Sequence, residues 1–251
     1  MRTLSALVLR ELKALFYSPI AYVALGLVLA LSGLNFYLIV SAFSAGPTPV
    51  TVVEAFFNTG AFWFSFFAIF PLITMRLYAE EFRLGTYELL QTAPVRDWQI
   101  VLAKFTGAYL FFLLLWLPTA LYFGIYRWIA REQAAPALGN YFGTYLLLAM
   151  MGAFFVSIGC LASVLTKNQV IAAILSFVAL AVIFNFSILG FVVPNLSPGI
   201  RRVLSYFSSV EHMYEFNRGI LSTQPVVYYL SGAMLLQYLT HAVLQFRRWK
   251  L

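Results

Sequence analysis

Six apolar runs, each about 20 residues or longer, constrain the fold of this 251-residue chain more than any other feature. A helix needs about 20 predominantly apolar residues to cross the hydrocarbon core of a bilayer. Buried helices of a large soluble protein would need polar faces, which these runs lack. We therefore predict an all-α integral membrane protein that forms one domain over residues 1–251. The six predicted transmembrane helices cover residues 20–43, 55–75, 101–125, 141–165, 170–193 and 226–245.

The composition supports a membrane location and argues against nucleic-acid binding. Apolar residues make up 62% of the chain and charged residues only 10%, whereas soluble domains are about 25% charged. The net charge is +7, but the basic residues lie mainly beside apolar runs, where they would meet lipid headgroups. We expect membrane lipid as a partner and no nucleic acid. The single cysteine, Cys160, excludes an intrachain disulfide.

Lysine and arginine are divided unevenly between the two predicted sides of the membrane. Cytoplasmic segments of membrane proteins carry an excess of these residues. With both termini on one side, that side holds eleven of the sixteen basic residues. The eleven are Arg2, Arg10, Lys13, Arg76, Arg83, Arg96, Lys104, Lys167, Arg247, Arg248 and Lys250, and the other five are Arg127, Arg131, Arg201, Arg202 and Arg218. We predict that both termini and the loop 76–100 are cytoplasmic and that residues 194–225 are extracytoplasmic.

The chemistry that the sequence lacks is equally informative. No ionisable residue falls in the central part of a predicted span, where proton relays and ion pathways need one. No Gly-Lys pair exists, so the chain has no phosphate-binding loop. His212 and His241 stand alone, and Asp97 is the only aspartate. We predict no catalytic site and no metal site, so any work that this protein performs is supplied by another subunit.

Residues 75–105 form a charged segment between two apolar runs. Tyr78, Phe82, Gly85 and Leu89 repeat on one helical face, which predicts a short helix over residues 78–91. Pro94 prevents its smooth continuation, and Lys104 is expected to extend its ammonium group toward the membrane surface. The segment could lie at the lipid interface, but anionic headgroups repel its glutamates. A protein partner with a complementary surface explains the mixed charge better.

The first nineteen residues contain an amphipathic stripe. Leu4, Val8, Leu12 and Leu15 share one helical face. This pattern predicts a helix that lies flat at the membrane surface before the chain turns inward at Pro19. A cytoplasmic extension of the first span is the alternative. In the fourth span, a stripe of small residues from Ala149 to Cys160 predicts close helix packing, either within the chain or against a second membrane subunit.

The charged segment resembles a loop of a known family. The stretch Glu80-Glu81-Phe82-Arg83-Leu84-Gly85-Thr86-Tyr87-Glu88-Leu89-Leu90, followed by Ala93-Pro94-Val95 and Lys104, is similar to the loop between the second and third spans of type-2 ABC transporter permeases. Arg10-Glu11-Leu12 with Ser18-Pro19, and the turn Ser163-Val164-Leu165-Thr166-Lys167-Asn168-Gln169, also resemble that family in order and spacing. Six spans with cytoplasmic termini match its architecture.

The resemblance implies a function and a set of partners. In that family the loop is a coupling helix that docks on a separate ATPase subunit. It therefore implies that two ATPase subunits hold ATP and magnesium, and that a second permease copy or a related permease completes the assembly. No cofactor is expected in this chain. The residues to which the resemblance assigns ATPase coupling are Tyr78, Glu80, Glu81, Phe82, Arg83, Gly85, Thr86, Glu88, Leu89, Pro94, Lys167 and Asn168.

Further motifs resemble one branch of the family. Glu211-His212-Met213, Phe216-Asn217-Arg218-Gly219, Val227-Tyr228-Tyr229-Leu230 and the closing Arg247-Arg248-Trp249 are most similar to permeases of gliding motility and of nitrous-oxide-reductase maturation. This implies an exporter in the bacterial cytoplasmic membrane. The alternative is a mechanical or scaffolding subunit that couples ATPase strokes to an extracytoplasmic partner and moves no cargo.

Overall fold

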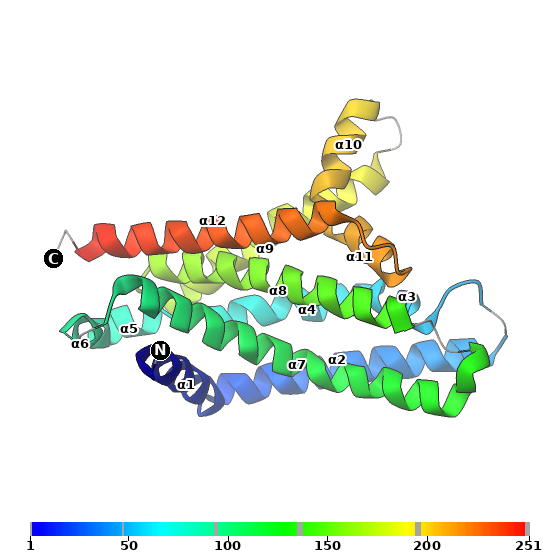
Figure 1. The fold of residues 1–251 in the computed structure, drawn as a ribbon, viewed down its shortest axis with the longest axis horizontal. Coiled ribbons are helices and arrows are strands. Elements are labelled where there is room, and N and C mark those ends of the chain that lie inside the picture. The colour runs from blue at the N-terminus through cyan, green and yellow to red at the C-terminus, as the bar shows by residue number, and fades with distance from the viewer. Residues whose placement is uncertain (1, 47, 93–94, 135–137, 194–196, 249–251) are drawn as a thin grey trace.

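The computed structural model is a bundle of long, roughly aligned helices with short helices at its two ends (Figure 1). It describes the whole chain except residues 1, 47, 93–94, 135–137, 194–196 and 249–251. The helices are α1 (Arg2–Phe16), α2 (Pro19–Ser44), α3 (Val52–Phe57), α4 (Gly60–Thr74), α5 (Ala79–Leu84), α6 (Thr86–Thr92), α7 (Asp97–Ala134), α8 (Leu138–Leu165), α9 (Gln169–Val192), α10 (Pro198–Phe207), α11 (Ser209–Asn217) and α12 (Thr223–Arg248). The predicted all-α class is confirmed.

Five helical stretches in the described part of the chain are long and apolar enough to cross a membrane. They are Pro19–Ser44, Gly60–Leu84, Asp97–Ile129, Gly139–Leu165 and Gln169–Ser187. The chain is therefore a multi-pass membrane protein. The sixth predicted span corresponds to α12, which is 26 residues long but less apolar than the other five. Polar residues such as Gln237 and His241 interrupt its apolar face, so the sixth span stays a prediction.

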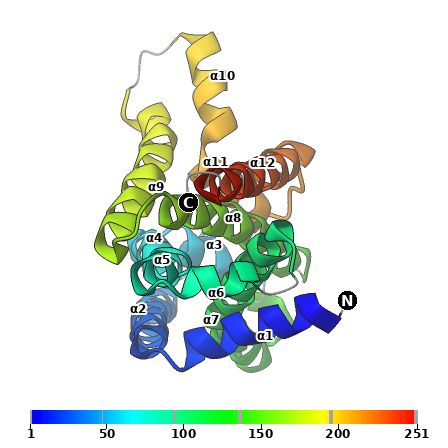
Figure 2. The ribbon, with the colours of Figure 1, turned by 90° about the vertical axis from the view of Figure 1, so that its left-hand side faces the viewer.

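The two chain ends and the charged segment lie at the same end of the bundle. Figure 2 views the molecule from this end, where α1, α5, α6 and the C-terminal end of α12 stand in front. The opposite end carries α3 and α11 (Figure 1). The predicted grouping of both termini with the loop 76–100 is thus present, while the side of the membrane on which that end lies is a prediction.

Helix α8 is the central element of the bundle. It packs against α4, α7, α9, α11 and α12, and it is the most deeply buried of the five candidate spans. Within its small-residue stripe, Ser157 accepts a hydrogen bond from Nε2 of Gln237 in α12, at 3.0 Å. Gly232 of α12 lies directly against the ring of Phe154. At Ser157 the stripe therefore packs against α12 of the same chain.

An aromatic layer fills the space between α4, α7 and α8. Phe66 lies with its ring centroid 5.9 Å from that of Phe112 and 5.6 Å from that of Phe155. Phe70 stacks on Phe112 at 5.1 Å. Each of these rings is fully buried or nearly so. Aromatic pairs at such separations stabilise a core beyond the effect of their buried area, so this layer holds the three helices in a fixed arrangement.

The second predicted span, residues 55–75, is wrong as a single helix. The chain forms α3, breaks at Asn58-Thr59, and resumes as α4. Thr59 caps α4 by accepting a hydrogen bond from the backbone N–H of Phe62. Asn35 of α2 stabilises the break, because its Nδ2 donates to the carbonyl oxygen of Phe56 and to Oγ1 of Thr59 at 3.2 and 2.9 Å. A polar side chain on a different helix thus stabilises the break at Asn58-Thr59, which the apolar sequence of residues 55–75 does not reveal.

A close contact between α8 and α4 generates a stability prediction. A Cβ atom added at Gly159 of α8 would lie 2.1 Å from Oγ1 and 2.5 Å from Cβ of Thr74 in α4. Because the Thr74 Cβ is fixed to its backbone, Gly159→Ala forces the two helices apart, and we expect it to lower the free energy of unfolding by about 1–3 kcal/mol. Gly124→Ala is the matched control, since nothing lies within 4 Å of that position. Denaturant titration of the solubilised protein measures the free energy of unfolding of both variants. Equal values would contradict the close contact between Gly159 and Thr74.

Candidate functional site

The charged segment folds into a helical corner rather than the single helix predicted over residues 78–91. Helix α5 ends at Leu84, Gly85 adopts the left-handed conformation with φ of 71°, and α6 starts at Thr86. A residue with a side chain is strained in this conformation, whereas glycine adopts it readily. Gly85 therefore turns the chain through the corner. We call the two helices and Gly85 the α5–α6 corner.

Helix α8 holds the start of the corner through one hydroxyl group. Oγ of Ser163 accepts hydrogen bonds from the backbone N–H groups of Tyr78 and Ala79, at 3.1 and 3.2 Å. The same hydroxyl donates to the carbonyl oxygen of Met75 at 3.3 Å. The backbone groups at the end of α4 and the start of α5 are thus satisfied by a side chain of α8. This arrangement fixes the corner to the centre of the bundle.

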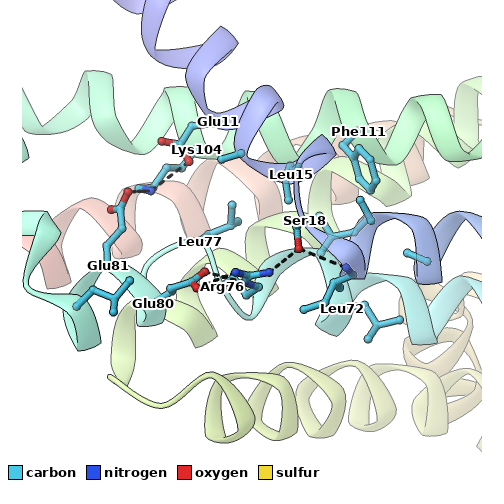
Figure 3. Close-up of a pocket in the computed structure, with 16 residues that line it drawn as sticks. Glu11, Leu15, Ser18, Leu72, Arg76, Leu77, Glu80, Glu81, Lys104 and Phe111 are labelled. Carbon is cyan, nitrogen blue, oxygen red and sulfur yellow. Dashed lines mark hydrogen bonds and ion pairs between the residues drawn. The ribbon is translucent and has the colours of Figure 1, made fainter.

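A buried lysine joins three helices at the corner (Figure 3). Nζ of Lys104, in α7, lies 3.2 Å from Oε2 of Glu11 in α1 and 2.8 Å from Oε1 of Glu81 in α5. Arg10 adds contacts to the same two carboxylates at 2.5 and 3.3 Å. The Lys104 side chain is only 1% exposed, so the expectation that it extends to the membrane surface is wrong. A buried ammonium requires counter-charges, and the sequence offered them only from distant segments.

The charge state of Glu11 follows from its position in this ion cluster. Burial raises the pKa of the Glu11 carboxyl, but Lys104 and Arg10 outweigh that effect and hold its pKa below the ordinary value. Because the folded-state pKa is depressed, the cluster stabilises the fold above the unfolded-state pKa. That stability is lost only as the pH falls below about 4.5. At neutral pH the Glu11 carboxyl is therefore ionised.

A second ion pair ties the corner to the start of α2. Arg76 binds Glu80 through two hydrogen bonds, from Nε to Oε2 at 2.6 Å and from Nη2 to Oε1 at 2.7 Å. Nη1 of Arg76 donates to Oγ of Ser18, the N-cap of α2. Such a two-point arginine–carboxylate pair fixes geometry as well as charge. Glu80 is thus engaged within the helix bundle.

The residues predicted for coupling divide into an inner and an outer set. Tyr78 is buried, Phe82 is half-buried, and Glu80 and Glu81 make the ion pairs just described. The outer set is exposed and consists of Arg83, Gly85, Thr86 and Glu88, joined by Leu84, which is 62% exposed. Pro94 lies outside the described residues, as does the side chain of Leu89.

The predicted turn at Lys167 and Asn168 lies beside the corner. Oδ1 of Asn168 accepts a hydrogen bond from the backbone N–H of Val170 at 2.9 Å, which caps α9. A groove of about 640 Å³ separates this turn from α5 and α6. Its lining includes Phe82, Tyr87, Glu88 and Lys167, together with Leu239, Val243 and Arg247 of α12. Both predicted coupling regions therefore border one apolar groove with a charged rim.

Sequence reasoning missed the contribution of α12 to this groove. The guanidinium carbon of Arg247 lies 4.7 Å from the centroid of the Phe82 ring, and its Nη2 donates to the carbonyl oxygen of Leu165 at 2.7 Å. Arg248 pairs with Asp97 at 3.3 Å. The Arg247-Arg248 pair at the end of the last apolar run is the signal that could have indicated contacts of this kind.

Comparison with protein families assigns the chain. A model of the ABC-2 family of transporter proteins matches residues 47–237, which is most of the chain and includes the corner. The chain belongs to the ABC-2 transporter family. A comparison with curated proteins found no match. Membrane subunits of ABC-2 transporters are not catalytic, and ATPase activity resides in a partner subunit. The resemblance found in the sequence is thereby confirmed at the level of the family.

The opposite end of this ABC-2 subunit has its own polar network, which sequence reasoning also missed. Glu54 of α3 is buried and pairs with Arg218 at 3.0 Å, and the Arg218 guanidinium lies 4.0 Å from the Tyr214 ring centroid. Oγ1 of Thr144, in α8, donates to Oδ1 of Asn217 at 2.9 Å. An acidic residue that opens an apolar run, such as Glu54, calls for a counter-charge, and that requirement was the available signal.

No group of three histidine, cysteine or acidic residues that could bind a metal occurs in the described part of the chain. His212 contacts Tyr229, whose hydroxyl is 3.1 Å from its Nδ1. Burial lowers the pKa of His212 to about 4. The imidazole is therefore neutral at physiological pH.

Removal of the buried cation should loosen α1 and the corner together. Lys104→Met removes the ammonium that Glu11 and Glu81 share and leaves them Arg10, so we expect a loss of about 2–3 kcal/mol in the free energy of unfolding. Lys167→Met is the control, since Lys167 is exposed. Adding Glu11→Gln to Lys104→Met should restore part of the loss, which a double-mutant cycle measures. If the stability losses of Lys104→Met and Glu11→Gln simply add, the Lys104–Glu11 ion pair is contradicted.

Acid should destabilise the protein through His212. The pKa is about 4 in the folded protein and near 6.5 when unfolded, so the unfolded chain binds more protons between these values and stability falls as the pH is lowered through them. Between pH 7 and pH 5 we expect a loss of about 2 kcal/mol. His212→Gln should flatten this dependence in thermal unfolding. A dependence that survives His212→Gln would assign the effect to another group.

Proposed function

We propose that this chain is the permease subunit of an ATP-driven ABC exporter, and that ATPase subunits dock on the outer set of the α5–α6 corner. The division of the corner carries this proposal. Its inner residues are bound to α1, α7 and α8, while Arg83, Leu84, Thr86 and Glu88 are exposed. A mixed-charge surface that the bundle does not use suits a water-soluble protein partner. The groove beside the Lys167 turn extends this surface toward α12.

The corner is suited to transmit movement into the bundle. A displacement of α5 acts on α7 and α1 through Lys104, on α2 through Arg76 and Ser18, and on α8 through Ser163. These are charged or backbone hydrogen bonds with little room to stretch. Closure of two ATPase subunits around ATP and magnesium would thus move several helices at once.

The proposed assembly extends the family assignment. It contains two ATPase subunits and two permeases, either two copies of this chain or one copy and a related subunit, in a bacterial cytoplasmic membrane. The single permease domain covers residues 1–251, with α12 as the sixth span and both termini in the cytoplasm. Eleven of the sixteen basic residues then lie on the cytoplasmic side, which supports this orientation.

A mechanical role is the second candidate, and helix α10 favours it. This helix projects from the bundle and has no buried residue (Figure 1). Ile200 and Val203 are more than half exposed and share the helix with Arg201 and Arg202. Such a helix could receive an extracytoplasmic partner, as the resemblance to gliding-motility and nitrous-oxide-reductase-maturation permeases suggests. A cargo-sized cavity between two permeases in the purified complex would favour export, and a closed apolar seam would favour force transmission.

The docking proposal predicts the effect of changing exposed charges. Arg83→Glu combined with Glu88→Lys reverses two charges of the outer set and leaves the ion pairs of Glu80 and Glu81 intact. We expect this double variant to lose most of the ATPase subunit that co-purifies with the tagged wild-type permease from native membranes. Mass spectrometry identifies the ATPase by its Walker motif, and ATP hydrolysis by the eluate is the second readout.

The matched control reverses two charges at the other end of the molecule. Arg201→Glu with Arg202→Glu changes exposed residues of α10 and should retain the ATPase. Thermal unfolding of both double variants verifies that each is folded. Undiminished co-purification with the corner variant would refute docking at the outer set.

A further inference from the structure

An amphipathic cavity of about 240 Å³ lies between α1, the corner and the helices α2, α4 and α7 (Figure 3). One part of its lining is apolar and comes from α2, α4 and α7, including Ala21, Ala24, Leu72 and Phe111. The other part is charged. The cavity is smaller than the roughly 300–1,000 Å³ of typical drug-sized ligand sites. It suits the headgroup of an amphipathic molecule whose chains remain in the bilayer.

The charged part of the lining carries more negative than positive groups. Glu11, Glu80 and Glu81 line the cavity together with only two cations, Arg76 and Lys104. Arg10 binds Glu11 and Glu81 from outside the lining. With Arg10 included, three carboxylates meet three cations, so a ligand that carries both charges and no net charge is favoured over a purely anionic one.

One carboxylate oxygen at the cavity lacks a partner. Oε1 of Glu81 is engaged by Lys104 and Arg10, but Oε2 is buried and makes no hydrogen bond within the described residues. A buried acceptor without a donor is costly. A ligand that turns the Glu81 side chain toward the cavity would supply the missing N–H group.

Arg76 offers the complementary feature. A guanidinium group has five N–H donors, and three hydrogen bonds from Arg76 to Glu80 and Ser18 are present among the described residues. Two N–H groups remain for an oxyanion. The same cavity thus presents an acceptor for an ammonium group and donors for a phosphate.

We propose that this cavity binds the headgroup of a zwitterionic phospholipid with a primary amine, such as phosphatidylethanolamine. The ammonium group donates to Glu81 and the phosphate accepts from Arg76. The acyl chains lie along α2, where Tyr22 and Val23 are more than 60% exposed. A lipid bound there contacts α1, α2 and the corner simultaneously, so membrane composition would set how firmly the corner is held.

A series of lipids that differ only in amine methylation tests the proposal. Phosphatidylethanolamine, its monomethyl and dimethyl derivatives and phosphatidylcholine share the phosphate and the net charge but lose N–H donors stepwise. Native mass spectrometry of the delipidated full-length permease measures how much of each lipid is retained, and thermal unfolding measures stabilisation. We expect at least about tenfold preference for phosphatidylethanolamine over phosphatidylcholine, since a hydrogen bond to a charged group is lost.

Two variants connect this preference to the cavity. Glu81→Gln should reduce the preference to near unity, while Glu88→Gln, the same change at an exposed residue of α6, should retain it. Because Glu81→Gln also removes a partner of Lys104, Leu84→Trp serves as a second variant. Leu84 lines the cavity and is 62% exposed, so a larger ring narrows the cavity without overpacking the core. It should lower retention of phosphatidylethanolamine.

Two outcomes would overturn the proposal. Equal retention across the methylation series would mean that lipid binds without recognition of the amine. Stronger retention of phosphatidylglycerol would mean that the cavity selects negative charge. The measurements use the permease alone, so they do not depend on whether an ATPase docks at the corner.

Discussion

The buried ammonium of Lys104 is the constraint on which the end of the bundle with α1 and the α5–α6 corner depends. It lies two helical turns into α7, where an unpaired charge would be strongly unfavourable. Its two carboxylate partners come from α1 and α5, which belong to segments far apart in the sequence. Neither segment can leave its place without exposing or isolating a charge. The surface helix and the α5–α6 corner are therefore held as one unit.

The same interaction explains why only part of a charged segment faces outward. Four acidic and four basic residues lie between Met75 and Phe105, and on sequence alone all of them could meet a partner in water. Glu80 and Glu81 are engaged by Arg76 and Lys104, so the surface left for an ATPase is narrower and closer to Gly85. Under the proposed function, the inner charges transmit movement and the outer ones determine which partner binds.

The sequence predicted the features that depend on local composition. Apolar runs identify the long helices because the cost of placing polar groups in hydrocarbon dominates there, and the helical stripe of residues 1–19 predicts α1. The errors occur where a distant residue decides. Asn35 stabilises the break before α4, and Glu11 retains Lys104 in the interior. Gly85 was a signal for the corner, since glycine commonly ends helices. The continuous amphipathic stripe of residues 78–91 nevertheless favoured a single helix.

Helix α8 connects this unit to the opposite end of the molecule, which carries α3 and α11 (Figure 1). Near its last turn Ser163 binds the start of the corner, and in its first turns Thr144 binds Asn217 of α11. Its 28 residues span about 42 Å as a helix. Close-packed interiors shift between discrete arrangements rather than deform continuously. Under the proposed function, a tilt imposed at Ser163 reaches α11 as movement of a rigid rod, and the Glu54–Arg218 pair and the His212–Tyr229 contact adjust to it.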